Sequence, residues 1–321
     1  IQLKGSGRTP FSRGGDGRAP LYYMLKEYLF SETMHYLGVP SSRSLAVVET
    51  GDTVYRPEGD TGAVLTRVAS SHIRVGTFAY ALHYGDRSSL EALADYTIAR
   101  HYPELLEAED KVVLFFDEFL KVQAKVVAKW MALGFVHGVM NTDNTSISGE
   151  TFDYGPCAFI DTYDLNAVYS SIDRFGRYRY GQQPAILLWN ARRFAETLLP
   201  LIDEDENKAH DRLMVQLNQF PTYFEEAYYG EMTQKLGLFV DDAKSRSLLG
   251  QLLRFMEEHK LDYTNTFVDL RRLDFTQEIY QKQDFVTWRQ AWVKLMGVQG
   301  QTPEEAKKWM ESKNPLIVAR N

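Results

Sequence analysis

Residues 134–144 are a short segment rich in turn-forming and polar residues. They follow a long stretch in which apolar residues recur regularly. They read Gly134-Phe135-Val136-His137-Gly138-Val139-Met140-Asn141-Thr142-Asp143-Asn144, and Asp153-Tyr154-Gly155 follows shortly after. Apolar residues recur at helical spacing over 109–133, which predicts a buried helix leading into the segment. Carboxylate and amide oxygens are the ligands that hard divalent cations prefer. The segment 134–155 is therefore predicted to be a loop that binds metal.

The spacing of His137 and Asn144 matches the catalytic loop of protein kinases, H-R-D-L-x-x-x-N. Val139 occupies the position of the kinase aspartate, and a valine side chain accepts no proton. The Asp-Tyr-Gly tripeptide that begins at Asp153 is a variant of the D-F-G metal motif. Asn144 and Asp153 are thus predicted to bind magnesium. The alternative from this motif alone is an ordinary turn, in which Asp143 and Asn144 bond their own backbone.

A lysine and a glutamate near the beginning of the chain have the order of the kinase phosphate-binding pair. Lys4 ends a strand-like run, and Glu27 follows 23 residues later, inside a helical pattern from Pro20 to about Leu37. In kinases such a strand lysine and helix glutamate pair and hold phosphates. Each residue alone is compatible with an ordinary surface position. Their order and spacing together favour a nucleotide site.

Other candidate anion-binding residues lie nearby in the sequence. Residues 13–18, Arg-Gly-Gly-Asp-Gly-Arg, could form a backbone nest for phosphate, although they lack the lysine and serine of a P-loop. Arg67 and Arg74 are candidates for bidentate phosphate binding, with unpaired surface arginines as the commoner alternative. His137 is expected to be a structural hydrogen-bonding residue, because no paired cysteines or H-E-x-x-H motif accompany it.

Hydrophobic periodicity predicts a mixed first part and a helical remainder. Strands are expected over 44–50 and 63–69. Helices are expected over 20–37, 88–101, 109–133, 185–200, 209–229, 243–259, 284–296 and 303–311. The predicted fold is α+β, of the two-lobed protein-kinase type, with an ATP cleft between the lobes. Residues 1–80 would form a small mixed lobe, and residues 81–321 a larger, mainly helical lobe with the loop 134–155.

Composition restricts the class of protein. Hydrophobic residues make up 44% and charged residues 25% of the chain, as in soluble globular proteins. The net charge of −7 disfavours a nucleic-acid partner, and no apolar run is long enough to predict a membrane span. The single cysteine, Cys157, excludes an internal disulfide framework. We expect a cytoplasmic monomer, or a mitochondrial one if the source is eukaryotic. Because Ile1 begins the chain without an initiating methionine, we also expect a fragment.

Long, nearly uninterrupted stretches of the chain resemble the selenoprotein O (YdiU) family of kinase-like protein adenylyltransferases. The resemblance implies an enzyme that binds ATP in an orientation flipped relative to kinases. It also implies transfer of AMP to serine, threonine or tyrosine hydroxyls of protein substrates. The likeness covers most of the chain and is carried by residues 3–13, 15–19, 70–76 (Ser-Ser-His-Ile-Arg-Val-Gly), 134–144, 153–156, 176–178 and 183–184.

Matching positions imply roles for particular residues. Asp143 matches the proposed proton acceptor, while Asn144 and Asp153 match the ligands of magnesium, or of manganese in its place. An upstream glycine-rich segment of the family and its C-terminal tail, which in some members bears a redox-active cysteine or selenocysteine, are missing from this sequence. The positions that match nucleotide-contacting residues, or their partner on the helix, are Lys4, Asp16, Gly17, Glu27, Arg67 and Arg74.

Two other functions stay open beside adenylyl transfer. One is a phosphotransferase that uses Asp143 as a displaced base, and Val139 argues against it. The other is a catalytically silent ATP-binding or interaction module. Retention of both predicted metal ligands, together with Lys4 and Glu27, argues against a silent module, because it would have no evident chemical need for all four side chains.

Overall fold

A computed structural model describes residues 1–12, 14–56 and 59–320 of the chain. These residues form two compact units of mixed α and β structure, which confirms the predicted α+β class. The first unit comprises residues 1–126, 137–157 and 185–220, and the second comprises 127–136, 158–184 and 221 onward. The chain passes between the units within helices α4 (Lys111–Leu133), α5 (Gln183–Leu198) and α7 (Phe220–Lys235).

The first unit contains a four-stranded antiparallel sheet organised around β4 (Asp60–Val68). Strand β3 (Arg43–Val54) pairs with one edge of β4. Strands β1 (Gln2–Lys4) and β2 (Ala19–Pro20) pair one after the other with its opposite edge. Leu65 of β4 lies opposite both Lys4 and Val47 in register. Because directly opposed residues point to the same face of a sheet, Lys4 projects on the buried face that Leu65 occupies.

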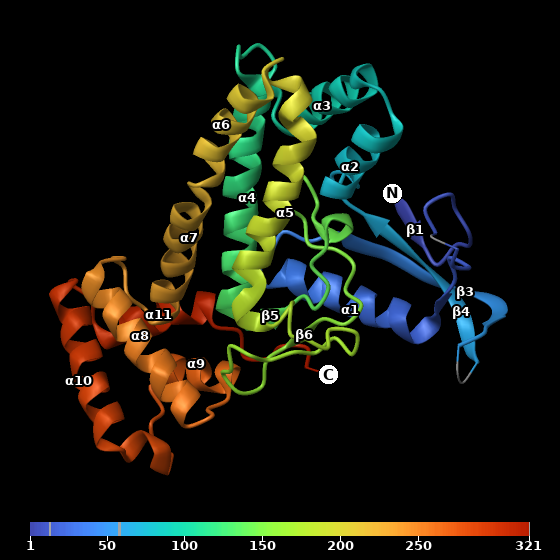
Figure 1. The fold of residues 1–321 in the computed structure, drawn as a ribbon. Helices are drawn as coiled ribbons and strands as arrows, with labels where there is room; N and C mark the ends of the chain where they lie inside the picture. The colour runs from blue at the N-terminus through green and yellow to red at the C-terminus, as the bar shows by residue number, and fades with distance from the viewer. Residues whose placement is uncertain (13, 57–58, 321) are drawn as a thin grey trace. The chain divides into compact units, whose positions relative to one another are not determined.

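Helix α1 (Leu21–Tyr36) covers this face of the sheet, and Figure 1 shows it alongside β3 and β4. Pro20 precedes the helix, where a missing backbone N–H leaves no helical bond unmade. Met24 of the helix packs with Ala63 and Leu65 in a small apolar core. Glu27 lies on the same buried stripe and is only 1% exposed. A carboxylate buried in this way requires cationic partners.

The remaining helices of the first unit are α2 (Val75–Tyr84), α3 (Arg87–His101), α6 (Glu206–Leu217) and the parts of α4 and α5 that belong to this unit. Aromatic side chains join α2, α4 and α5. The ring of Phe194 from α5 lies 5.0 Å from that of Phe78 in α2 and 4.8 Å from that of Phe119 in α4. Helices α4 and α5 run side by side in Figure 1. This contact fixes α2 to the two helices that bracket the segment 134–155.

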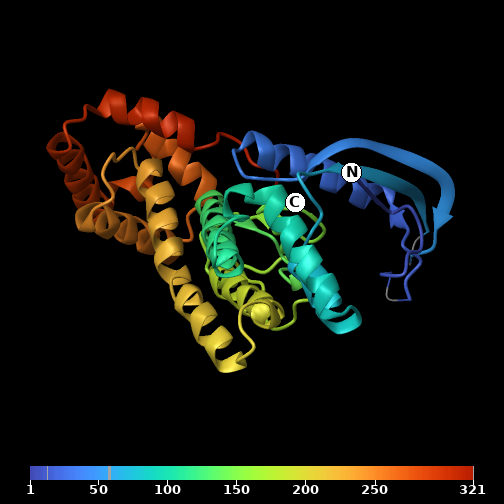
Figure 2. The same cartoon turned by 90° about the horizontal axis from the view of Figure 1, so that it is seen from above.

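The second unit is a helical cluster with a small two-stranded ladder. Strands β5 (Phe135–Val136) and β6 (Ala158–Phe159) pair antiparallel. The stacked rings of Trp288 and Trp292 lie 5.5 Å apart within a buried apolar core. Besides α7, the helices of this unit are α8 (Ala243–Glu258), α9 (Tyr263–Arg272), α10 (Gln283–Val298) and α11 (Pro303–Lys313), seen from above in Figure 2. Among the described helices, none is both long and apolar enough to cross a membrane.

The structure differs from the predicted α-helices in three places. The helix expected over 209–229 is two helices, α6 and α7, separated before Pro221. Proline lacks the backbone N–H and clashes with the preceding turn, so it fits the start of α7 and not a helix interior. Helices α2 and α9 were not predicted, although the Asp262 side chain caps α9 by accepting from the backbone N–H of Asn265. Each has only 10 residues, so an apolar pattern repeats fewer times within them than in the longer helices.

The core between α1 and the sheet leads to a stability prediction. Leu65→Ala should lower the free energy of unfolding by about 2–5 kcal/mol, because it opens a cavity beneath Met24. Val48→Ala on the opposite face, where Val48 is 58% exposed, is the matched control and should change stability by about 0.5 kcal/mol or less. Urea denaturation measures both. Equal losses for the two variants would contradict the assigned core.

Candidate active site

The side chains of Lys4, Glu27, Arg67 and Asp153 form a connected ionic cluster in the first unit. Lys4 Nζ lies 2.7 Å from Glu27 Oε2 and also contacts Asp153 Oδ1. Arg67 Nε donates to Glu27 Oε1 at 2.5 Å, and its Nη2 donates to Asp153 Oδ1 at 2.9 Å. Each carboxylate is thus shared by the same two cations. The structure brings together four of the residues that the sequence nominated.

Strand pairing explains why these cations meet. Gln2 lies opposite Arg67 in the register of β1 and β4, and Lys4 follows on the same face of β1. The Gln2 side chain accepts from Arg67 Nη1 at 3.0 Å and from Arg74 Nη2 at 3.3 Å. Gln2 therefore links two arginines and was missed in the sequence. The alternation of side chains along a strand could have found it, because Gln2 is two residues before Lys4.

Arg74 joins the cluster from the beginning of α2, where it is the N-terminal capping residue. Its guanidinium carbon lies 4.5 Å from the centre of the Phe152 ring, and that of Arg67 lies 5.7 Å from the same ring. Burial, reinforced by the neighbouring Arg67, lowers the pKa of Arg74. The face of Phe152 offers both guanidinium groups a cation–π contact. With Lys4, the cluster holds three cations against two carboxylates, in a protein whose net charge is negative.

Asp153 stands at the partly exposed side of this cluster. Its backbone has a φ of +66°, which is uncommon for a residue other than glycine. Burial pushes the pKa of Asp153 upward, but Lys4 and Arg67 outweigh this and hold it below the ordinary value. The side chain is 32% exposed, and among the described residues its polar contacts all fall on Oδ1. Oδ2 is thus the carboxylate oxygen of Asp153 that makes no hydrogen bond or ion pair within the described part of the chain.

The segment 137–144 is connected to Asp153 through His137. The buried His137 ring bonds the Phe152 carbonyl oxygen through Nε2 at 3.0 Å, and the Val139 N–H approaches Nδ1 at 3.4 Å. Burial lowers the pKa of His137, which favours the neutral ring that this pattern requires. The structural role expected for His137 is confirmed. Asn144 Nδ2 donates to the Val139 carbonyl at 3.0 Å, which leaves the amide oxygen as the group that could bind a cation.

Two buried amide side chains that the sequence did not nominate support this segment from the flanking helices. Asn190 of α5 donates through Nδ2 to the Met140 carbonyl at 3.1 Å and to Thr145 Oγ1 at 2.9 Å. Gln123 of α4 donates to the Ser146 carbonyl at 2.7 Å. Neither residue lies in a recognisable motif. Their roles follow only from the packing of the helices.

Asp143 belongs to a single 3-10 turn, Thr142–Asn144, and its side chain lies against the first turn of α2. Its Oδ1 is so close to Gly76 that a β-carbon built on that glycine would be 2.1 Å away. Arg74 pairs with Ser146 in an isolated antiparallel bridge, and the Val75 N–H donates to the Thr145 carbonyl at 3.0 Å. Asp143 and Arg74 are therefore held to the same turn of one helix. The N-terminal end of a helix favours a negative charge.

The structure places Asp16 and Gly17 in the loop between β1 and β2, and not in the ionic cluster. Asp16 accepts two hydrogen bonds of 3.0 Å from Arg56. These bonds, and to a lesser extent a hydrogen bond from the backbone N–H of Arg18, lower the pKa of Asp16. A β-carbon on Gly17 would lie 2.0 Å from the Gly7 carbonyl oxygen, so only glycine fits there. Among the described residues, neither has a polar contact with the cluster. Arg13, part of the predicted phosphate nest, lies outside the described residues.

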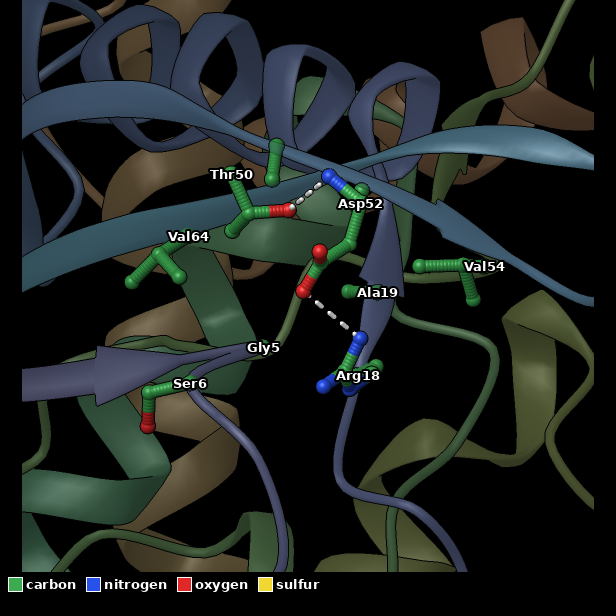
Figure 3. Close-up of a pocket in the computed structure, with 10 residues that line it drawn as sticks. Gly5, Ser6, Arg18, Ala19, Thr50, Asp52, Val54 and Val64 are labelled. Carbon is green, nitrogen blue, oxygen red and sulfur yellow. Dashed lines mark hydrogen bonds and ion pairs between the residues drawn. The ribbon is translucent and has the colours of Figure 1, made fainter.

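A small cavity lies next to the C-terminal end of β1, where this loop begins. Figure 3 shows the Arg18 side chain directed at Asp52, with a separation of 2.9 Å. The cavity measures about 80 Å³ and includes Gly5, Thr50 and Gly62 in its lining. Pockets for drug-sized ligands measure roughly 300–1,000 Å³. This cavity alone cannot enclose a nucleotide.

The donor groups at the site fit magnesium only in combination with a ligand that brings further oxygens. No group of three or more histidine, cysteine, aspartate or glutamate side chains suited to a metal is found among the described residues. Magnesium, however, is commonly held by one or two carboxylates together with water and substrate phosphates. The Asp153 carboxylate and the Asn144 amide oxygen match that chemistry. These residues therefore fit a metal that arrives with a phosphate-bearing substrate.

Comparison with known proteins identifies the family. The family model described as protein adenylyltransferase SelO matches residues 1–321. The chain belongs to the SelO family. It is 52% identical over 321 residues to the protein nucleotidyltransferase YdiU of Anoxybacillus flavithermus and 51% identical over 322 residues to that of Geobacillus kaustophilus. Both alignments cover 100% of this chain and 66% of the relative.

A further SelO-family relative is the protein nucleotidyltransferase YdiU of Clostridium perfringens, 49% identical over 322 residues. This alignment also covers 100% of the chain and 66% of the relative. The chain thus spans about two thirds of the length of the curated relatives that it matches. Membership of the family confirms the resemblance seen in the sequence.

The buried ion pair of this SelO-family chain leads to a second stability prediction. Glu27→Gln should lower the free energy of unfolding by about 3–5 kcal/mol, because it removes one of the two carboxylates that pair with the buried Arg67 guanidinium and leaves only Asp153. Glu32→Gln, which weakens the more exposed pair with Arg43, is the matched control and should cost about 1 kcal/mol. Urea denaturation again gives the comparison. Similar losses for both variants would show that the Glu27 cluster is not buried in solution.

Proposed function

We propose that this protein is an adenylyltransferase that moves AMP from ATP to hydroxyl groups of protein side chains. The observation that carries this proposal is the cluster of Lys4, Arg67 and Arg74 around the partly exposed Asp153. Three cations near an available carboxylate suit a triphosphate and its metal. The family described as protein adenylyltransferase and the relatives named protein nucleotidyltransferase support the same reaction class.

The proposed architecture is a two-lobed fold of the protein-kinase type. Residues 1–80 would form the small lobe, and residues 81–321 the larger helical lobe with the loop 134–155. The antiparallel sheet, the packed helix α1 and the Lys4–Glu27 pair support this proposal, because kinases use the same strand lysine and helix glutamate. Lys4, Arg67 and Arg74 would bind the phosphates, with Glu27 holding Lys4 and Arg67 in place. Asp16 and Gly17 would contact the nucleotide from the loop between β1 and β2.

Asn144 and Asp153 would hold magnesium, or manganese in its place. The metal would neutralise charge on the phosphate oxygens of the bound nucleotide. Val139 has no proton-accepting group, so a base is needed at another position. If ATP lies flipped relative to kinases, its α-phosphate is the group near Asn144 and Asp153. Asp143, next to Asn144 in the sequence, is then the base that we propose.

In the proposed reaction, Asp143 accepts the proton of a serine, threonine or tyrosine hydroxyl of the protein substrate. The hydroxyl oxygen bonds to the α-phosphorus, and the bond from that phosphorus to the bridging oxygen breaks. Pyrophosphate leaves with the negative charge, which Lys4, Arg67 and Arg74 would stabilise. A phosphotransferase would need a base near the γ-phosphate, and Val139 disfavours it. A cytoplasmic monomer without nucleic-acid or membrane partners stays a prediction.

The identity of the transferred group can be tested with labelled ATP. The full-length protein given α-labelled ATP should label protein hydroxyls and release pyrophosphate, whereas γ-labelled ATP should leave protein unlabelled. Asp143→Ala should lower the rate by about 10²–10⁴-fold, the usual contribution of a general base. Transfer of the γ-label would identify a phosphotransferase. Tight ATP binding without transfer of either label would favour the silent module.

The metal assignment can be tested by calorimetry. Asp153→Asn keeps the shape of the side chain but removes its charge, so magnesium should no longer strengthen ATP binding. Asp95→Asn removes a comparable exposed carboxylate, which pairs with Lys111 at 2.7 Å, and should leave the magnesium effect intact. Binding of ATP without metal should persist in both variants, because Lys4 and Arg67 remain. An unchanged magnesium effect in Asp153→Asn would refute the assignment.

A further inference from the structure

Gly76 lies directly against the Asp143 carboxylate, which occupies space that a side chain at position 76 would fill. A β-carbon on Gly76 would lie 2.1 Å from Asp143 Oδ1 and 3.3 Å from its Cγ. A separation below about 3 Å is not tolerated between such atoms, so any larger residue at position 76 would force the carboxylate to move. The third nearest atom to that β-carbon is the Asp143 Cα, at 3.5 Å. The three nearest atoms therefore all belong to Asp143.

Backbone conformation does not explain the glycine. Gly76 is absent from the residues with positive φ, so a residue with a side chain could adopt its backbone angles. It lies in the first turn of α2, and within a helix alanine is more favourable than glycine by up to about 1 kcal/mol. Helix stability alone would select another residue. Neither backbone conformation nor helix stability explains a glycine at position 76, whereas its contact with Asp143 does.

The backbone around this contact fixes its two sides in register. Arg74 and Ser146 form an antiparallel bridge, the Val75 N–H donates to the Thr145 carbonyl at 3.0 Å, and the Ile147 N–H donates to the Ile73 carbonyl at 3.0 Å. The residues just before Gly76 are thus held by main-chain bonds to the residues just after Asp143. Sliding α2 away to accommodate a side chain at position 76 would break these bonds. The Asp143 side chain itself would have to rotate.

We propose that Gly76 is a positioning residue for Asp143, holding its carboxylate against the first turn of α2 in the orientation required for proton transfer. The catalytic part of this inference rests on the proposed adenylyl transfer, whereas the contact itself does not. Gly76→Ala should displace the carboxylate while leaving Lys4, Arg67 and Arg74 in place. Its effect should therefore appear in the chemical step and not in the binding of ATP.

A double-mutant cycle measured by thermal unfolding tests the contact independently of activity. Gly76→Ala should raise the Tm more in an Asp143→Ala background than in the wild-type background, because only the wild type contains the carboxylate that the new methyl group meets. Gly230→Ala in α7 is the matched control, since a β-carbon there meets nothing within 4 Å. Its effect on Tm should be the same in both backgrounds. Equal effects of Gly76→Ala in the two backgrounds would overturn the proposal.

Kinetics of AMP transfer by the full-length protein test the catalytic part. Gly76→Ala should lower kcat by about 10–10²-fold with little change in KM for ATP, because displacement of a reacting group by about 1 Å has effects of this size. In the Asp143→Ala background it should cause no further loss, since the displaced group is already absent. An unchanged kcat, or a rise in KM alone, would overturn the positioning role. Absence of transfer by the wild type would count against the proposed function instead, and the Tm cycle would still decide the contact.

Discussion

The buried Glu27 carboxylate determines how the first unit is assembled. A charged group almost completely removed from water is tolerated only when opposite charges and hydrogen bonds replace its hydration. Lys4 and Arg67 provide that replacement, and they come from two strands that must already be paired. The docking of α1, the register of β1 against β4 and the position of Asp153 therefore depend on one another. A change in any of them weakens the compensation of these buried charges.

The two cations that satisfy Glu27 are not equivalent. The Arg67 side chain is 5% exposed and bonds Glu27, Asp153 and Gln2 at once, so it has little freedom to move. The Lys4 side chain is 28% exposed, ends its strand and is a flexible point charge with three donors. Lys4 is accordingly the cation better able to exchange its contact with Asp153 for one with an incoming anion. Arg67 would meanwhile keep Glu27 compensated.

Sequence reasoning succeeded where chemistry is concentrated in a few residues at fixed spacing. Lys4, Glu27 and Asp153 were nominated from kinase-like order, and the structure brings their side chains into contact. It failed where the information lies in packing: Gln123 and Asn190 support the loop from two helices, and neither has a local pattern around it. Pro221 marked the division of α6 from α7 and was overlooked, because apolar periodicity continues across it.

Helix α2 was the most consequential omission, because it joins the parts of the site that the sequence left separate. Arg74 caps its beginning, Gly76 leaves room for Asp143, and Phe78 is buried against Phe194 of α5. Positions 74, 76 and 78, at the cap and in the first turn of one short helix, thus contact the ionic cluster, the Asp143 carboxylate and the aromatic core. Main-chain bonds at Val75 and Ile73 also link the beginning of this helix to Thr145 and Ile147 of the loop. A helix of 10 residues that was not predicted from the sequence can therefore link several parts of the site.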